Sequence, residues 1–192
     1  PGYAQCIISQ TDKPNFANWK WGQSFTANCT GTLKSIKVLS VTDKTGVSFF
    51  VRSGEGIAGS SLGSTSVNFV SDFNNYNVID VSSLNISVTS GQKYTFHVTD
   101  FVTVTIQNTG TDAYAGGQAF QSDIAYSTHD ITFEVEITPD NFAPTSANFT
   151  AEPKEGMVYA FATEDFSYSD HEDDPLDHIT VSAPASGTLF ID

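Results

Sequence analysis

Apolar and polar residues alternate along most of the first 140 residues. In the clearest example, Ile131, Phe133, Val135 and Ile137 alternate with threonine and glutamate. A period of two is typical of a strand that buries one face. The same alternation recurs in the segments 36–38, 47–51, 94–98 and 102–106. The pattern predicts many short strands, each with one face in a core.

Polar turn signals separate these runs, at residues 53–56, 74–75, 90–91 and 108–110. No segment of residues 1–139 has the apolar period of an amphipathic helix of normal length. Many short strands with one apolar face each indicate two sheets packed face to face. We therefore predict an all-β fold, in which residues 1–139 form a β-sandwich of jelly-roll type.

The composition changes near residue 140. Pro139 and Pro144 lie five residues apart among polar neighbours, which favours a stiff, extended junction. Residues 1–139 carry 11 acidic and 7 basic side chains, whereas residues 140–192 carry 11 and 1. We place a domain boundary here, so that residues 140–192 form a second, smaller β segment.

Strand-like runs in this second segment cover residues 146–151, 157–162, 178–182 and 186–191. About 50 residues make a marginal core. Calcium, or further chain beyond Asp192, is therefore expected to supply the missing stability.

An acidic stretch dominates the second segment. Six carboxylates fall within residues 165–177, and Asp170, Glu172 and Asp174 alternate with other residue types before Pro175. Alternate side chains of an extended loop converge, and like charges repel unless a cation neutralises them. Oxygen ligands select calcium over zinc or copper. The stretch predicts a calcium site, the alternative being a solvated loop without metal.

An EF-hand does not fit this stretch. With Asp170 as loop position one, Pro175 takes the place of the glycine at position six, and Val181 takes the place of the glutamate at position twelve.

The net charge of −14 excludes roles that need attraction to nucleic acid or anionic lipid. No apolar run approaches the roughly 20 residues of a membrane span. The first residues lack a signal segment, so any secretion signal is expected to have been removed. Cys6 and Cys29 lack CxxC spacing, and either a disulfide of a secreted protein or two buried thiols is compatible with them.

Short motifs in the second segment resemble the opening half of the cadherin-like, immunoglobulin-type repeats of bacterial adhesins and surface proteins. They are Asn-Phe-Ala-Pro-Thr at 141–145, Asp-Phe-Ser-Tyr-Ser-Asp at 165–170, Asp-Pro-Leu at 174–176 and Gly-Thr-Leu at 187–189. The resemblance implies a β-sandwich repeat, cut off near its middle, whose acidic turn binds calcium and stiffens a chain of domains.

The resemblance also implies the calcium ligands. Asp170, Glu172 and Asp174 match the family positions, and the weaker candidates are Asp165, Glu155 and Asp140. Glu172 stands where the family usually has aspartate, and Asp173 stands where glycine is usual. Neither departure removes a carboxylate, although both change the geometry of the turn.

The first segment resembles a β-sandwich module of secreted bacterial multidomain proteins, similar in outline to carbohydrate-binding modules. The matching motifs are residues 23–27, 31–33, 90–96 and 114–117. Sugar sites need exposed aromatic rings, and the candidates are Trp19, Trp21, Tyr76 and Tyr114, with Asn18, Asn74 and Asn75 for hydroxyl groups. On one strand Trp19 and Trp21 would share a face, either as a platform for sugar or as a cap on the core.

Two functions follow from these patterns. The first is a non-catalytic extracellular module, secreted or at the cell surface, with an adhesion or extender role and a calcium-stiffened repeat. The alternative is a carbohydrate-binding accessory module of a secreted polysaccharide-degrading enzyme. The expected partners are a polysaccharide or cell-surface glycan and neighbouring domains of a longer chain, without nucleic acid or membrane insertion.

Catalysis by this chain is not expected. The sequence contains neither G-x-S-x-G nor H-E-x-x-H. A glycosidase needs two carboxylates beside a cleft, and Glu134 and Glu136 occupy ordinary outward strand positions.

Overall fold

The computed structural model describes residues 6–108, 112–140, 144–147, 149–150, 157–170, 176 and 178–180. Within these residues the regular structure consists of strands and two single 3₁₀ turns, and all strand ladders are antiparallel. The predicted all-β fold is confirmed. The chain divides into two compact units, Pro1–Asp140 and Asn141–Asp192.

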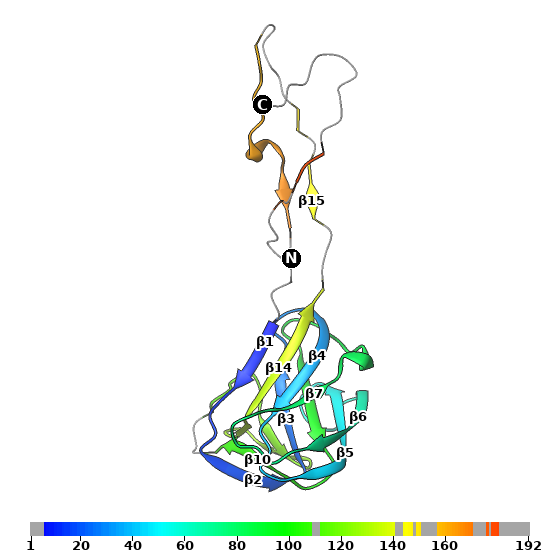
Figure 1. Ribbon diagram of the computed structural model, residues 1–192, viewed down its shortest axis with the longest axis vertical. Coiled ribbons are helices and arrows are strands. Elements are labelled where there is room, and N and C mark those ends of the chain that lie inside the picture. Colours follow the sequence, from blue (N-terminus) through cyan, green and yellow to red (C-terminus); the bar gives the residue numbers. More distant parts are fainter. Residues whose placement is uncertain are drawn as a thin grey trace. The chain divides into compact units, whose positions relative to one another are not determined.

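Sheet 1 of the first unit has the strand order β1-β14-β4-β7, with β8 also paired to β4. Its strands are β1 (Cys6–Gln10), β4 (Gly31–Val38), β7 (Asn77–Asp80), β8 (Ser87–Val88) and β14 (Phe133–Pro139). In register across the sheet, Ile8 pairs with Val135, Val135 with Ile36, and Ile36 with Ile79. All four are buried, so this row forms part of one apolar face. Figure 1 shows the strands β1, β14, β4 and β7 of this sheet.

Sheet 2 has the order β12-β11-β3-β9-β5-β6, and sheet 3 has the order β13-β10-β2. The strands of sheet 2 are β3 (Trp21–Thr26), β5 (Lys44–Ser53), β6 (Ser61–Phe69), β9 (Lys93–Val98), β11 (Ala119–Gln121) and β12 (Ile124–Tyr126). Those of sheet 3 are β2 (Asn15–Trp19), β10 (Val102–Gln107) and β13 (Asp130–Ile131). A 3₁₀ turn, η1 (Ser82–Leu84), precedes β8.

The core of the first unit lies between sheets 1 and 2. Phe96 of sheet 2 meets Phe133 of sheet 1 with ring centroids 5.7 Å apart, and Trp21 packs edge-on against Phe96 at 6.2 Å. The predicted apolar face of residues 131–137 is fully buried. A sandwich therefore encloses this core, as predicted, and the alternating pattern places its apolar residues inside because strand side chains point to opposite faces.

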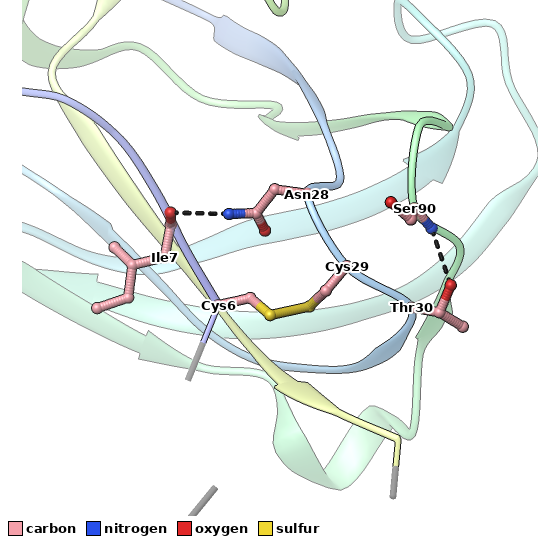
Figure 2. The surroundings of a disulfide bond; sticks show 6 residues. All are labelled: Cys6, Ile7, Asn28, Cys29, Thr30 and Ser90. Atoms are coloured by element: carbon pink, nitrogen blue, oxygen red, sulfur yellow. Dashed lines mark hydrogen bonds between the residues drawn. A yellow bond between two sulfur atoms is a disulfide. The ribbon is translucent and has the colours of Figure 1, made fainter. Parts of the chain in front are cut away.

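A disulfide joins Cys6, at the start of β1, to Cys29, in the turn between β3 and β4, with Cα atoms 6.4 Å apart (Figure 2). Beside it, Asn28 Nδ2 donates a hydrogen bond to the Ile7 carbonyl at 3.1 Å. The backbone N–H of Ser90 donates to Thr30 Oγ1, also at 3.1 Å. Of the two alternatives for the cysteines, the structure contains the disulfide, and it fixes the first strand to this turn.

Within the described residues, no helix is both long enough and apolar enough to cross a membrane.

The described part of the second unit contains one short ladder, between β15 (Thr145–Ser146) and β16 (Tyr168–Ser169), and a 3₁₀ turn, η2 (Thr163–Asp165). Residues 157–162 were predicted to form a strand, and they do not. This segment is an apolar run without regular polar alternation, and such a run becomes a strand only where it meets a partner strand.

Several partly exposed aromatic rings contact one another in the described part of the second unit. Phe161 contacts Tyr159, Phe166 and Phe149, with centroid distances of 5.3, 5.9 and 6.5 Å. Beside these rings lies an apolar depression of about 450 Å³, lined by Phe161, Phe166, Leu176 and Ile179 among others.

Candidate functional site

A bend at Lys20 separates the two tryptophans. Trp19 ends β2 of sheet 3, whereas Trp21 begins β3 of sheet 2. The backbone N–H of Ser122 donates to the Lys20 carbonyl at 2.8 Å and holds the bend. Trp21 is fully buried in the core and Trp19 is half-buried. The two residues lie on different strands, yet both pack against the hydrophobic core, as the alternative of a cap on the core expects.

Trp19 belongs to a surface cluster of three rings, Trp19, Tyr126 and His129, here called the Trp19 cluster. Trp19 stacks on Tyr126 with centroids 5.1 Å apart and an interplanar angle of 22°, and it lies 6.4 Å from His129. Tyr126 and His129 are 5.2 Å apart. All three side chains are half-buried, so their ring surfaces remain partly open to solvent.

Backbone hydrogen bonds fix the segment that carries Tyr126 and His129. The His129 N–H donates to the Tyr126 carbonyl at 3.0 Å, and the His129 carbonyl accepts from the Ala119 N–H at 2.7 Å. The first bond closes a tight turn directly after β12, and the second ties that turn to β11. The two rings therefore sit on sheet 2 and meet Trp19, which comes from sheet 3.

Polar side chains surround the Trp19 cluster. Tyr126 Oη donates to Gln121 Oε1 at 2.9 Å, and Thr128 Oγ1 lies 3.2 Å from His129 Nδ1. Asn18 is exposed, but it points to the face of β2 opposite Trp19. Aromatic surface with amide and hydroxyl groups at its rim can stack against an apolar ring face and hydrogen-bond to the polar edge of the same ligand.

Tyr114, a predicted ligand-binding residue, packs on the core as Trp19 does, but it is not part of the Trp19 cluster. Its hydroxyl oxygen accepts a hydrogen bond from the Thr26 N–H at 3.1 Å, and its ring lies edge-on to Phe133 at 5.3 Å. Burial raises the pKa of its phenol above the ordinary value. Tyr114 thus supports the fold rather than the Trp19 cluster.

Tyr76 and its neighbours also lie apart from the cluster. Burial is the main cause that raises the pKa of Tyr76, followed by the nearby charge of Glu134 on sheet 1. The backbone N–H groups of Asn74 and Asn75 both donate to Asp72 Oδ1, at 2.8 and 3.0 Å. These asparagines close a turn, and of the four predicted aromatic residues only Trp19 joins the candidate site.

Asp130 is a fully buried carboxylate next to Tyr114. Its Oδ1 accepts from Gln23 Nε2 at 2.8 Å and its Oδ2 accepts from the Tyr114 N–H at 3.1 Å. Gln23 Oε1 in turn accepts from the Ile131 N–H at 2.9 Å. Burial raises the pKa of Asp130 to about 6, although these hydrogen bonds favour the ionised form. Because Asp130 has no access to solvent, its role is to link three segments of the fold.

The described calcium candidates lie in different local settings. Asp140 donates its backbone N–H to the Thr30 carbonyl at 3.1 Å. Asp165 Oδ2 accepts from the Ala162 N–H at 2.9 Å and caps η2. Asp170 is half-buried directly after β16.

The other three candidates, Glu155, Glu172 and Asp174, lie outside the described residues. The described part of the chain has no group of three or more His, Cys, Asp or Glu side chains that could hold a metal ion. Calcium binding therefore stays a prediction.

Sequence reasoning missed Tyr126 and His129. Their only sequence signal is a spacing of three within a polar, turn-forming segment, and nothing in that spacing points to Trp19, more than 100 residues earlier. No protein-family model matches the chain and no curated protein is similar to it, so its function must be inferred from the site itself.

Proposed function

We propose that the protein is a non-catalytic, extracellular β-sandwich module that binds carbohydrate at the Trp19 cluster. The observation that carries the proposal is the half-buried ring of Trp19, stacked on Tyr126 at 5.1 Å with His129 beside it. Tryptophan, tyrosine and histidine each combine an apolar ring surface with a polar atom.

Sugar rings match this surface chemically. One face of a pyranose presents C–H groups that pack on an aromatic ring, and its edge presents hydroxyl groups that need hydrogen-bond partners. The amide of Gln121 and the hydroxyl of Thr128 are near the cluster and uncharged. Neutral donors and acceptors around aromatic surface favour a neutral sugar over an ion.

The state of the strand carboxylates supports a non-catalytic role. Glu136 forms an ion pair with Lys34 at 2.9 Å, and Glu134 forms one with Lys37. Asp130 is closed off from solvent. These carboxylates are engaged in pairing and folding, whereas glycoside hydrolysis needs two carboxyl groups free to face the substrate.

The disulfide supports the extracellular part of the proposal, because such bonds persist in oxidising compartments and are rare in the cytosol.

Binding to a panel of neutral soluble polysaccharides, measured by affinity electrophoresis and calorimetry, tests the proposal. Trp19→Ala should lower the affinity for the bound polysaccharide by at least about tenfold, as is usual for a central aromatic contact. Phe16→Ala is the matched control, because Phe16 also lies in β2 and is 56% exposed but points away from the cluster. Its affinity should equal that of the wild type.

A purely structural cluster gives a different result. If the three rings only close the sandwich, Trp19→Ala lowers the thermal midpoint while no polysaccharide binds the wild-type protein. That result would refute carbohydrate binding here.

A calcium-stiffened adhesion or spacer role is the second candidate function. The observation that favours it is the charge of the second unit, where residues 140–192 carry 11 acidic side chains and one basic. This role is tested by comparing the thermal stability of that unit in calcium and in a chelator.

A further inference from the structure

We propose that the outer face of sheet 2 carries a second ligand site, centred on Arg52, that binds the carboxylate of an acidic sugar. The site is separate from the Trp19 cluster and does not depend on it.

The strand register places the site. Phe49 and Val51 of β5 are fully buried in the core, so Phe50 and Arg52 point to the opposite, outer face. Phe50 pairs with His97 of β9 on one side and with Ser64 of β6 on the other. Directly paired residues share a face of the sheet, and this row therefore lies on the outer face.

Arg52 extends the same face by one row. It pairs with Thr95 of β9, which is fully buried, and, after a register shift between Val51 and Arg52, with Ser61 of β6. Ser61 and Ser64 are exposed and Arg52 is half-buried, so a guanidinium lies next to two accessible hydroxyl groups.

Hydrogen bonds and ring contacts hold the guanidinium in a fixed plane. Arg52 Nε donates to His97 Nε2 at 2.8 Å, and Nη1 donates to the Gly59 carbonyl at 3.0 Å. The guanidinium carbon lies 5.6 Å from the centroid of the Phe50 ring. Phe50 and His97 stack at 5.1 Å with an interplanar angle of 12°. Among the described residues Nη2 has no hydrogen-bond partner. Its N–H groups, which the other contacts of the guanidinium hold in a fixed plane, can therefore donate to a ligand.

The charge of Arg52 is not balanced within the described chain. Lys34, Lys37 and Lys93 each form an ion pair with a glutamate. Arg52 is the single arginine of a chain of net charge −14, yet none of the ion pairs of the described residues includes it. A partly buried cation with only neutral acceptors is costly, and a bound anion offsets that cost.

His97 does not add a second positive charge. Because Nε2 accepts a hydrogen bond from Arg52, the proton of the neutral ring is on Nδ1. Burial, and then the charge of Arg52, lower the pKa of His97 to about 4. The site therefore presents one guanidinium at neutral pH.

The planar guanidinium of one arginine matches one carboxylate in shape and charge, and binds it through two parallel hydrogen bonds. The Phe50 ring and the hydroxyl groups of Ser61 and Ser64 suit the apolar face and the hydroxyl groups of a sugar. The combination points to a uronic acid type of sugar. The negative charge of the whole chain opposes the binding of an acidic sugar only weakly, because screening at physiological salt limits this repulsion to about 8 Å.

NMR titration of the full chain tests the site. Galacturonic acid oligomers are the ligand, and galactose oligomers are the uncharged control. The acidic oligomers should shift the signals of His97 and Ser64 saturably, and the neutral ones should not. A bound carboxylate also stabilises the imidazolium, so the pKa of His97 should rise above about 4. Equal shifts with inorganic sulfate would show an unselective anion site and overturn the assignment to a carboxylate.

Two serine variants separate this site from general charge effects. Ser61→Asp places a carboxylate opposite Arg52 in register, where it competes with the ligand, and should weaken binding at least about tenfold. Ser66→Asp adds the same charge on the same strand, opposite Ser48, and should weaken binding less than about twofold because the charge is exposed. Equal losses in the two variants would overturn the proposal.

Two further variants complete the test. Arg52→Lys keeps the charge and loses the planar fork, so its affinity should also fall about tenfold. Phe16→Ala, at an exposed ring that belongs to neither site, should leave the binding of the acidic oligomers unchanged. Thermal midpoints within error of the wild type confirm that each variant is folded.

Discussion

The two units use their apolar residues in opposite ways. In the first unit the alternating strands bury Phe49 and Phe96 completely. In the second unit Val158 is 85% exposed, Met157 69% and Phe161 53%. Apolar content alone does not make a core, because burial requires two apolar faces that the pattern brings together.

The charges of the units differ as well. The first unit pairs three of its lysines, Lys34, Lys37 and Lys93, with glutamates, whereas residues 140–192 have a single basic residue for 11 acidic ones. Packing therefore stabilises the first unit, and we expect the stability of the second to depend on neutralising its charge.

Of the changes that test this contrast, the removal of a buried core ring should have the largest effect on the free energy of unfolding. Trp21→Ala should lower the free energy of unfolding of the first unit by about 3–5 kcal/mol, the usual cost of emptying a large buried site. Trp21 Nε1 has no partner among the described residues, so the loss is one of packing. Phe161→Ala, at an exposed ring of the second unit, should cost less than about 1 kcal/mol. Urea unfolding followed by NMR signals of each unit measures both, and similar losses would abolish the contrast.

Removing the disulfide should have the second-largest effect on the free energy of unfolding. Replacing both Cys6 and Cys29 with serine should destabilise the first unit by about 3 kcal/mol, since the bond closes a loop with a sequence separation of 23. Signals of the second unit should keep their midpoint. Reduction of the wild type serves as the control and should produce the same loss. A variant as stable as the oxidised protein would show that the bond adds nothing to the sandwich.

Two buried groups of the first unit should give opposite dependences of stability on pH. Native His97 stays neutral down to about pH 4, while in the unfolded chain it takes up a proton near its ordinary pKa of 6.5, so the stability falls as pH drops from 6.5 to 4. Native Asp130 keeps its proton up to about pH 6, while in the unfolded chain it loses it near 3.8, so the stability falls as pH rises from 3.8 to 6. The two dependences should nearly cancel in the wild type.

Single variants should reveal each dependence. His97→Gln should leave a stability that falls by about 1–2 kcal/mol between pH 4 and pH 6, and Asp130→Asn should leave one that rises by a similar amount. Urea unfolding across this range, without acidic sugar, provides the measurement. Equal slopes in the wild type and both variants would contradict the assignment of these two groups.

Calcium should produce the smallest change, restricted to the second unit. With calcium in place of a chelator, the thermal midpoint reported by signals of the second unit should rise by a few degrees, and that of the first unit should stay constant. Magnesium is the matched control ion, and Asp170→Asn should reduce the response. An unchanged midpoint would argue for a solvated acidic loop without metal.

The sandwich could be predicted from the sequence because its signal is local. Val47, Phe49 and Val51 alternate with polar residues within a single strand, and burial follows from that period. The sequence left the state of the cysteines open because a disulfide depends on a Cα–Cα distance, here 6.4 Å, that only the fold sets.

The sites could be predicted only in part because they depend on register between distant strands. Arg52 and His97 meet through the pairing of β5 with β9, and Trp19 meets Tyr126 through two sheets. Trp19 and Trp21 do not lie on one strand, because the chain changes sheet at Lys20.

That change of sheet gives the protein two independent fluorescent reporters. Trp21, enclosed among phenylalanine rings, should emit at short wavelength until the sandwich unfolds, whereas Trp19 meets solvent in the native state. With Trp21 replaced by phenylalanine, the remaining indole would report on the surface alone. Ligand occupancy could then be followed by the emission of Trp19 in that variant, and unfolding by the emission of Trp21 in a Trp19→Phe variant.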